Sequence, residues 1–174
     1  LEELESNVVG AQLGGRALEN SVLAAGIGLL LIMVFMIAVY LIPGLASVIA
    51  LLVYVVMIVL LLNGFDITLT LPGIAGIILS IGMAVDANVI IFARIREEIA
   101  TGKTVSSSVK IGFKKANSAI IDGNVTTLIA ALVLGIIGTG AVKGFAQTLG
   151  LGIAVSMFTA LFVTRIVLSA FYAL

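Results

Sequence analysis

The feature that most constrains the fold is the run PGIAGIILSIGMAVDANVIIFARIREE at residues 72–98. It holds some twenty apolar or small residues before charge begins at Arg94, which is the length of a membrane-spanning helix. One carboxylate, Asp86, lies within it. An acid there costs roughly 2.5–3.5 kcal/mol on insertion scales, so Asp86 is a candidate functional residue. The alternative is an aspartate whose partners are neighbouring helices and whose role is packing only.

Composition extends the membrane prediction to the whole chain. Of the 174 residues, 61% are hydrophobic and 10% charged, and the mean hydropathy is +1.33. This composition predicts an integral membrane protein. The absence of cysteine and histidine argues against thiol chemistry and transition-metal sites. A net charge of zero gives no reason to expect a nucleic-acid partner. Because the chain begins LEELESN, without Met or a signal-peptide pattern, we expect it to come from a longer chain.

The apolar runs predict an all-α bundle of five transmembrane helices. The polar residues 1–20 are interpreted as the end of an extracytoplasmic segment. Turn residues separate the helices at Pro43-Gly44, at 63–66, at Gly102 and at 138–140, and Lys143 is expected in a short loop. The predicted spans cover approximately residues 21–41, 45–62, 71–94, 118–137 and 145–172.

Residues 94–118 differ from the spans because they hold six of the nine basic residues. Gly102 is predicted to stop one helix and Thr104 to cap the next. A separate amphipathic helix is expected here, with Val105, Val109, Gly112, Phe113 and Ala116 on one face, lying in the lipid interface. A solvated connector is the alternative. The excess of Lys and Arg predicts that this segment and the C-terminus are cytoplasmic, with the N-terminal end outside.

Helical geometry indicates which residues accompany Asp86. Gly82 lies one turn earlier on the same face, and Gly73 and Gly76 add small positions, so we expect close helix packing at these three glycines. Asn88 lies about 200° round the helix from Asp86, so the two side chains are not expected to serve one site.

A second polar group lies in the fourth span. It consists of Asp122, Asn124 and Thr126, and Asp122 and Thr126 share a helical face. A supporting polar cluster between the third and fourth spans is one interpretation. The other places Asp122 among lipid headgroups at the start of the span.

Two stretches carry a family resemblance. GIAGIILSIGMAVDANVIIFARIREE and GFKKANSAIIDGNVTTLIAALVLGIIGTGAVKGFAQTLGLGIAVSMFTALFVTR are similar to signatures of the SecD family of bacterial protein-export subunits. This family resembles half-transporters of the resistance-nodulation-division (RND) superfamily. The resemblance implies six membrane helices per subunit, with an outer domain between the first two, so the chain corresponds to the second to sixth helices.

The resemblance also implies a function. Family members use the proton-motive force to assist preprotein translocation in the bacterial cytoplasmic membrane, with SecF and the SecYEG translocation channel as partners. Asp86 matches the family's membrane aspartate tied to proton passage, and Asp122, Asn124 and Thr126 match a D-x-N-x-T-T pattern given a supporting role. The alternatives are an RND-type efflux half-transporter and a passive scaffold docking SecF and the channel.

No catalytic residue, cofactor or metal is predicted. The sequence lacks a G-x-x-x-x-G-K-[ST] nucleotide loop, and no nucleophile is accompanied by a base, so the chain is not predicted to be an enzyme.

Overall fold

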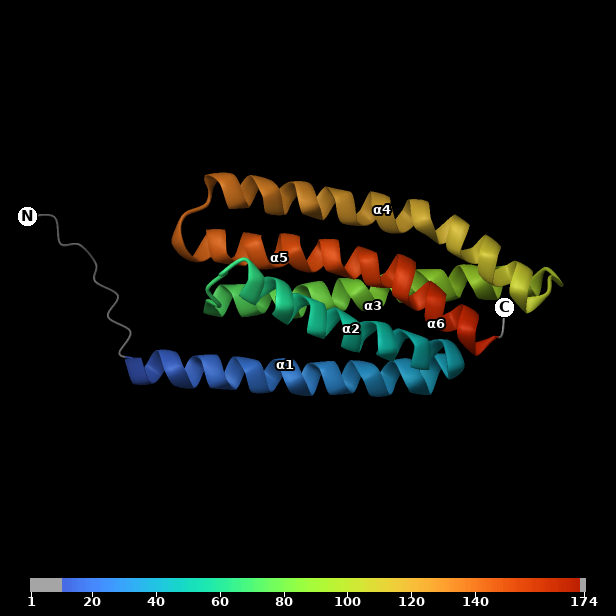
Figure 1. Ribbon diagram of the computed structural model, residues 1–174, viewed down its shortest axis with the longest axis horizontal. Coiled ribbons are helices and arrows are strands. Elements are labelled where there is room, and N and C mark those ends of the chain that lie inside the picture. The colour runs from blue at the N-terminus through green and yellow to red at the C-terminus, as the bar shows by residue number, and fades with distance from the viewer. Residues whose placement is uncertain (1–10, 173–174) are drawn as a thin grey trace, which may run out of the picture.

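The computed structural model describes residues 11–172, which form helices joined by short turns, with no strand among them. Five long helical segments run side by side and alternate in direction (Figure 1). The elements are α1 (Ala11–Tyr40), α2 (Ile42–Gly64), α3 (Leu71–Ala100), α4 (Val105–Ile137), α5 (Gly140–Phe158), the π-helical segment η1 (Thr159–Val163) and α6 (Thr164–Phe171).

Each of the five segments is long and apolar enough to cross a membrane, counting Gly140–Phe171 as one. Large apolar side chains cover the outside of the bundle, such as Leu31 at 62%, Leu60 at 65% and Ile136 at 83% exposure. An exterior of this kind suits lipid rather than water. The prediction of an all-α bundle with five membrane-spanning helices is confirmed.

Helix α3 occupies the centre of the bundle. It packs most extensively against α5 and α4 and also contacts α1 and α2 (Figure 1). Two of its glycines make the α5 contact possible. A Cβ at Gly76 would lie 2.6 Å from Thr148 Oγ1 and 3.0 Å from the Phe145 carbonyl oxygen, and one at Gly73 would lie 3.3 Å from Thr148 Cγ2. Small residues therefore allow the two backbones to approach closely.

The turns follow the local signals in the sequence. Gly102 has a φ of +84°, the left-handed conformation that favours glycine, and α3 ends just before it. The Thr104 side chain accepts a hydrogen bond from the Ser107 backbone N–H at 3.4 Å, as a helix N-cap does. The predicted stop at Gly102 and cap at Thr104 are confirmed.

The first and last helices begin earlier than predicted. Helix α1 begins at Ala11 rather than near residue 21, while residues 1–10 lie outside the described part. Helix α5 begins at Gly140 rather than at Phe145, so Lys143 lies within a helix and the prediction of a loop there is wrong. Arg16, Glu19 and Lys143 are exposed in these segments, and none of them interrupts the helical backbone.

The predicted separate amphipathic helix is also corrected, because α4 runs without interruption from Val105 to Ile137. Val109, Phe113 and Ala116 are buried in the bundle, whereas Val105 is 41% exposed. A Cβ at Gly112 would lie 2.5 Å from the Ile95 side chain, so the face predicted to lie in lipid packs against α3. The composition of α4 changes from basic to apolar near residue 118, but the α-helical backbone continues through this position.

The last membrane-spanning segment, Gly140–Phe171, contains an irregularity that the sequence does not predict. The turn between α5 and α6 is π-helical, at Thr159–Val163, and the Thr164 hydroxyl donates to the Thr159 carbonyl oxygen at 3.3 Å. Such segments often occur at functional positions in helices. Directly after this segment, the Thr164 side chain reaches the buried side of α3, where it donates a hydrogen bond to Asn88.

Candidate functional site

Asp86 lies in the middle of α3 on the side that the bundle leaves open. Its residue is exposed and borders two hollows. One, of about 390 Å³, lies between α1 and α3 beside Leu31 and Phe35, and the other, of about 190 Å³, lies between α3 and α4 beside Asn124. Six residues of α3 line these hollows, and we call four of them the Asp86 face: Gly82, Met83, Asp86 and Ile90.

The carboxylate of Asp86 has no partner within residues 11–172. No side chain or backbone N–H donates a hydrogen bond to it, and the ion pairs of this region involve Glu97 and Glu98 instead. The helices formed by residues 11–172 therefore supply no partner of the kind that the packing-only interpretation of Asp86 requires. A charge at this depth needs a partner, water or a proton.

Gly82 also differs from the expectation of close packing. A Cβ added to Gly82 would meet no described atom within 4 Å, because Gly82 faces the hollow between α1 and α3. Gly73 and Gly76 instead face α5 on another side of the helix. The three glycines thus belong to two different surfaces.

Asn88 lies on the closed side of α3, two residues beyond Asp86. Its Nδ2 donates to Ser47 Oγ at 2.9 Å, and the Thr164 hydroxyl donates to its Oδ1 at 2.8 Å. All three side chains are buried, with 3%, 1% and 0% exposure for Asn88, Ser47 and Thr164. This Ser47–Asn88–Thr164 network joins α2, α3 and α6. The prediction that Asp86 and Asn88 serve different sites agrees with this placement.

A second buried polar contact lies on the same closed side. Tyr54 Oη and Ser80 Oγ are 2.5 Å apart, and Ser80 also donates to the Ile77 carbonyl oxygen at 2.8 Å. Sequence reasoning missed both the Ser47–Asn88–Thr164 network and the Tyr54–Ser80 contact. Single polar residues in an otherwise apolar span, such as Ser47 and Tyr54, could have indicated buried hydrogen bonds. Their partners could not be identified in the same way, because they lie on helices far apart in sequence.

The predicted cluster of Asp122, Asn124 and Thr126 does not form. Asn124 is 9% exposed and borders the hollow that Asp86 also lines, with its Nδ2 donating to the Ile120 carbonyl oxygen at 2.8 Å. Asp122 and Thr126 are exposed elsewhere on α4. Asp122 accepts from the Ser118 hydroxyl at 3.2 Å, and Thr126 donates to the Gly123 carbonyl oxygen at 2.9 Å. The cause is helical geometry, which turns positions 122 and 126 away from position 124.

Glu98 is a second carboxylate of α3, located beyond the apolar part of the helix. Its side chain is 3% exposed and forms ion pairs with Lys103 and Lys115, which are 41% and 57% exposed. The hydrogen bonds from these two lysines hold the pKa of Glu98 below its ordinary value. The three residues fasten the end of α3 to the start of α4. Sequence reasoning took Glu98 as part of a charged run and missed this role.

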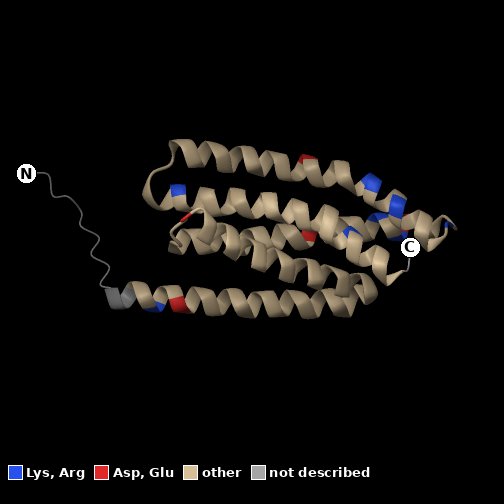
Figure 2. Ribbon diagram, in the orientation of Figure 1, with Lys and Arg blue, Asp and Glu red and all other residues tan. Residues whose placement is uncertain are grey.

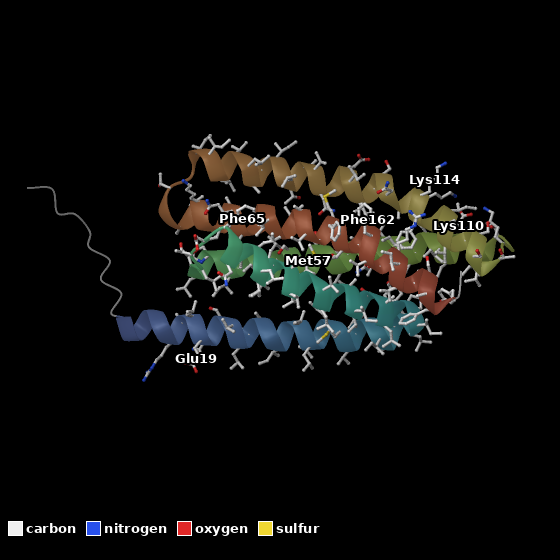
Figure 3. All side chains as sticks on the ribbon, viewed as in Figure 1. Glu19, Met57, Phe65, Lys110, Lys114 and Phe162 are labelled. Atoms are coloured by element: carbon white, nitrogen blue, oxygen red, sulfur yellow. The ribbon has the colours of Figure 1, made fainter. Side chains whose placement is uncertain are left out.

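Charge elsewhere in the bundle is concentrated at one end. Most Lys and Arg residues gather where α3 passes into α4, and the middle of the bundle holds few charged residues (Figure 2). Lys110 and Lys114 mark this basic end, whereas Glu19 and Phe65 lie toward the other (Figure 3). Within the described part of the chain, no group of three acidic, His or Cys side chains could hold a metal ion.

Comparison with known proteins identifies relatives. A family model described as "Protein export membrane protein SecD/SecF, C-terminal" matches residues 1–173. A protein translocase subunit SecD of Acidaminococcus fermentans is 52% identical over 170 residues, covering 98% of this chain and 41% of the relative. The subunit of the same name from Synechocystis is 51% identical, covering 97% of this chain and 36% of the relative. The chain therefore spans about two fifths of the length of these relatives.

Comparison of the fold with solved structures identifies the same family. A crystal structure of SecDF, a translocon-associated membrane protein from Thermus thermophilus, superposes with a TM-score of 0.91 at 39% identity. The match covers 94% of this chain and 23% of the SecDF chain. The predicted resemblance is confirmed, and the all-helical bundle matches part of a known membrane protein. The chain belongs to the SecD/SecF family of protein-export membrane proteins.

Proposed function

We propose that the protein containing this chain uses the proton-motive force to assist preprotein translocation across the bacterial cytoplasmic membrane, with Asp86 carrying the proton. The names of its relatives, SecD and SecDF, support the translocation role. The chain spans only part of those relatives, so this activity belongs to the longer protein. We propose no catalytic residue and no cofactor.

The observation that carries the proposal is the position of Asp86. It is a carboxylate in the middle of a span, without a partner from residues 11–172, beside two hollows. In a medium of low dielectric constant, adding or removing one proton changes the free energy of such a group by several kcal/mol. A change of that size can shift the balance between two arrangements of packed helices. Asn124, on the same hollow, is the nearest candidate for a supporting polar group.

The open side of α3 indicates how a partner would bind. We propose that helices of SecF cover the Asp86 face, because an exposed carboxylate is unsuited to lipid contact. A Cβ at Gly82 would meet no described atom within 4 Å, so this glycine leaves room for a helix to approach. The packing role predicted for Gly82 would then be served between subunits. The SecYEG channel and the moving preprotein are the further proposed partners, and lipid surrounds the remaining apolar exterior.

The two alternative functions, a passive scaffold and an efflux half-transporter, imply different roles for Asp86. A passive scaffold needs the residue only for assembly. An RND-type efflux half-transporter would usually place two acids in one span, whereas α3 has Asn88 two residues after Asp86 and buries it in a structural network.

The orientation follows from the basic end of the bundle. We propose that the turn between α3 and α4 and the C-terminus face the cytoplasm and the N-terminal end faces outside, because cytoplasmic segments collect Lys and Arg. Residues 1–174 contain no cysteine, so single cysteines at Ser107 and Thr139 would be the only thiols in this part of the protein. They should react with membrane-impermeant maleimide from opposite sides, and labelling from one side only would contradict the topology.

The experiment that tests the function replaces Asp86 with Asn in the full-length protein. The neutral amide is cheaper to bury than an anion, so assembly should persist while stimulation of preprotein export by the proton gradient is lost. Asp122→Asn is the matched control, because it removes an exposed carboxylate of α4 away from the hollow. Normal gradient-dependent export by an assembled Asp86→Asn variant would support the scaffold instead.

A further inference from the structure

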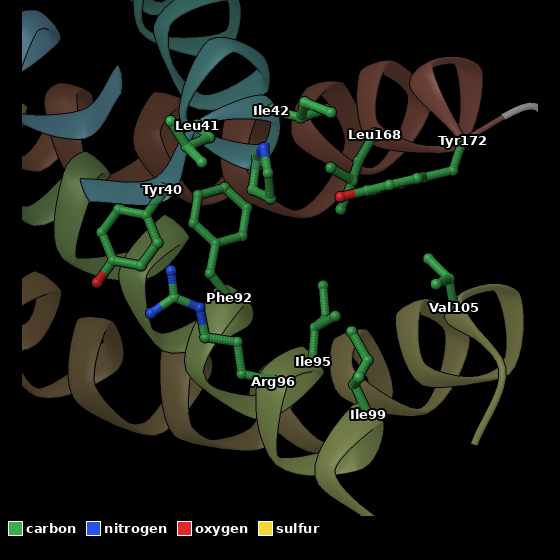
Figure 4. A pocket seen from close by; sticks show the side chains of 11 residues that line it. Tyr40, Leu41, Ile42, Phe92, Ile95, Arg96, Ile99, Val105, Leu168 and Tyr172 are labelled. Carbon is green, nitrogen blue, oxygen red and sulfur yellow. The ribbon is translucent and has the colours of Figure 1, made fainter. Parts of the chain in front are cut away.

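A hollow of about 290 Å³ lies at the basic end of the bundle, away from the Asp86 face. Its walls come from the turn between α1 and α2, the end of α3, the start of α4 and the last turn of α6 (Figure 4). Phe92, Ile95, Ile99 and Leu168 make the walls apolar. Tyr172 lies across the hollow beside Leu168 (Figure 4). The hollow has room for a flexible apolar chain and opens at the surface.

Arg96 stands at the edge of this hollow. Its guanidinium lies 4.8 Å from the centre of the Tyr40 ring, and Nη2 donates to the Val39 carbonyl oxygen at 3.2 Å. These contacts hold the group in place, and Figure 4 shows it beside Tyr40. They use few of its five N–H donors.

Like Lys110, Lys114 and Arg165, Arg96 has no ion-pair partner among the described residues, but of these four it alone lines this hollow. By contrast, Arg94 pairs with Glu97, and Lys103 and Lys115 pair with Glu98. An exposed guanidinium held at the edge of an apolar hollow therefore offers a site to an anion that carries an apolar chain.

We propose that this hollow binds an anionic glycerophospholipid, with its phosphate on Arg96 and part of one acyl chain between Phe92, Ile99 and Leu168. A guanidinium matches a phosphate through two parallel hydrogen bonds, which a lone ammonium group does not offer. Tyr40 and Tyr172 belong to the residue type enriched at the level of lipid headgroups. Basic pockets between membrane helices are known lipid-headgroup sites. Charge and shape thus favour a lipid over a soluble anion or an apolar peptide.

The test measures lipid retention by the full-length protein in mild detergent, using native mass spectrometry. Dioleoylphosphatidylglycerol and dioleoylphosphatidylcholine are titrated separately. We expect the wild-type protein to retain the anionic lipid more strongly. Arg96→Gln should bind it about tenfold more weakly, the effect of losing one charged hydrogen-bonding group. Arg96→Lys keeps the positive charge but loses the paired donors of the guanidinium, so its affinity for the anionic lipid should lie between those of the wild type and Arg96→Gln.

Two further variants separate the hollow from general basic charge. Lys114→Gln removes one positive charge at the same end of the bundle but outside this hollow, and should retain the anionic lipid as the wild type does. Ile99→Phe partly fills the hollow without changing charge, and should weaken retention of both lipids. Thermal unfolding checks that each variant is folded.

The proposal would be overturned by any of three results. These are equal retention of the two lipids by the wild type, undiminished retention by a folded Arg96→Gln variant, and displacement of the bound lipid by millimolar inorganic phosphate. The last result would assign Arg96 to a soluble anion. Loss of lipid binding in Arg96→Gln together with normal gradient-dependent export would leave both this proposal and the proposed function intact.

Discussion

The two carboxylates of α3 have opposite surroundings. Glu98 is buried at the helix end and paired with Lys103 and Lys115, whereas Asp86 is exposed in mid-span and has no partner within residues 11–172. Lys103 and Lys115 stabilise the anionic form of Glu98, so at neutral pH it acts as an anion that fastens α3 to α4. Asp86 lacks such cationic partners among the described residues, and this difference is the reason we propose it as the proton-carrying acid. In this fold, the difference between the structural acid and the proposed functional acid lies in their partners rather than in the residue type.

The same division extends along the sides of α3. Its closed side faces α2, α5 and α6 with Gly76 and the Ser47–Asn88–Thr164 network, and its open side carries the Asp86 face. Changes on the closed side should affect folding of the bundle, and changes on the open side should affect activity or assembly. The following predictions test that division, beginning with the largest effect on stability.

The glycines give the largest contrast. Gly76→Ala places a Cβ 2.6 Å from Thr148 Oγ1 and 3.0 Å from the Phe145 carbonyl oxygen, so it should lower the free energy of unfolding by about 1–3 kcal/mol. Gly82→Ala meets no described atom within 4 Å. It should leave stability unchanged or raise it by up to about 1 kcal/mol through helix propensity. Denaturant unfolding in detergent measures both, and equal destabilisation would mean that the Asp86 face is not open.

The two buried asparagines give the next contrast. Asn88→Ala removes hydrogen bonds to two other helices and should cost about 1–2 kcal/mol. Asn124→Ala is the matched control, because among the described residues its amide donates to the carbonyl oxygen of Ile120, on its own helix, and to no other helix. It should cost less than about 1 kcal/mol in the same unfolding assay. A larger loss from Asn124 than from Asn88 would contradict the assignment of the structural network to the closed side.

The smallest expected effect concerns the pH dependence of Glu98. Its pKa is lower in the folded protein than its ordinary value of 4.5, so the stabilisation is complete above that value and is lost as pH falls through the lowered pKa. Glu98→Gln should reduce stability slightly at neutral pH and flatten the loss of stability below pH 4.5. Thermal unfolding as a function of pH checks this. A variant as acid-sensitive as the wild type would separate Glu98 from acid unfolding.

Much of the fold is predictable because membrane helices leave clear signals in sequence. Apolar runs give the five spans, and local residues such as Gly102 and Thr104 give the turns and caps. The continuity of α4 is not predictable from composition, because its basic first half packs against α3 while its apolar second half passes along the bundle. The π-helical segment escapes prediction because no residue pattern in Thr159–Val163 marks it, and the hydrogen bond from Thr164 to Asn88 beside it joins residues far apart in sequence.

The site was predicted less completely than the fold. The sequence indicates Asp86 because a single acid in a long apolar run is costly, and helical geometry separates it from Asn88. Helical geometry alone does not determine which side of α3 faces the other helices, because apolar residues surround both Asp86 and Asn88 in the sequence. The packing of Gly82 and the cluster around Asp122 therefore differ from expectation. The lysine partners of Glu98 become evident only when α3 and α4 are brought together.

The most direct test of the central claim is proton flux through the assembled full-length complex. Reconstituted vesicles containing an entrapped pH-sensitive dye are given an imposed proton gradient, and the wild type is compared with Asp86→Asn and Asp122→Asn. The amide of Asn cannot take up and release a proton near neutral pH, so the Asp86→Asn complex should show the flux of protein-free vesicles. Asp122→Asn should conduct like the wild type. Wild-type flux through a fully assembled Asp86→Asn complex would contradict the account.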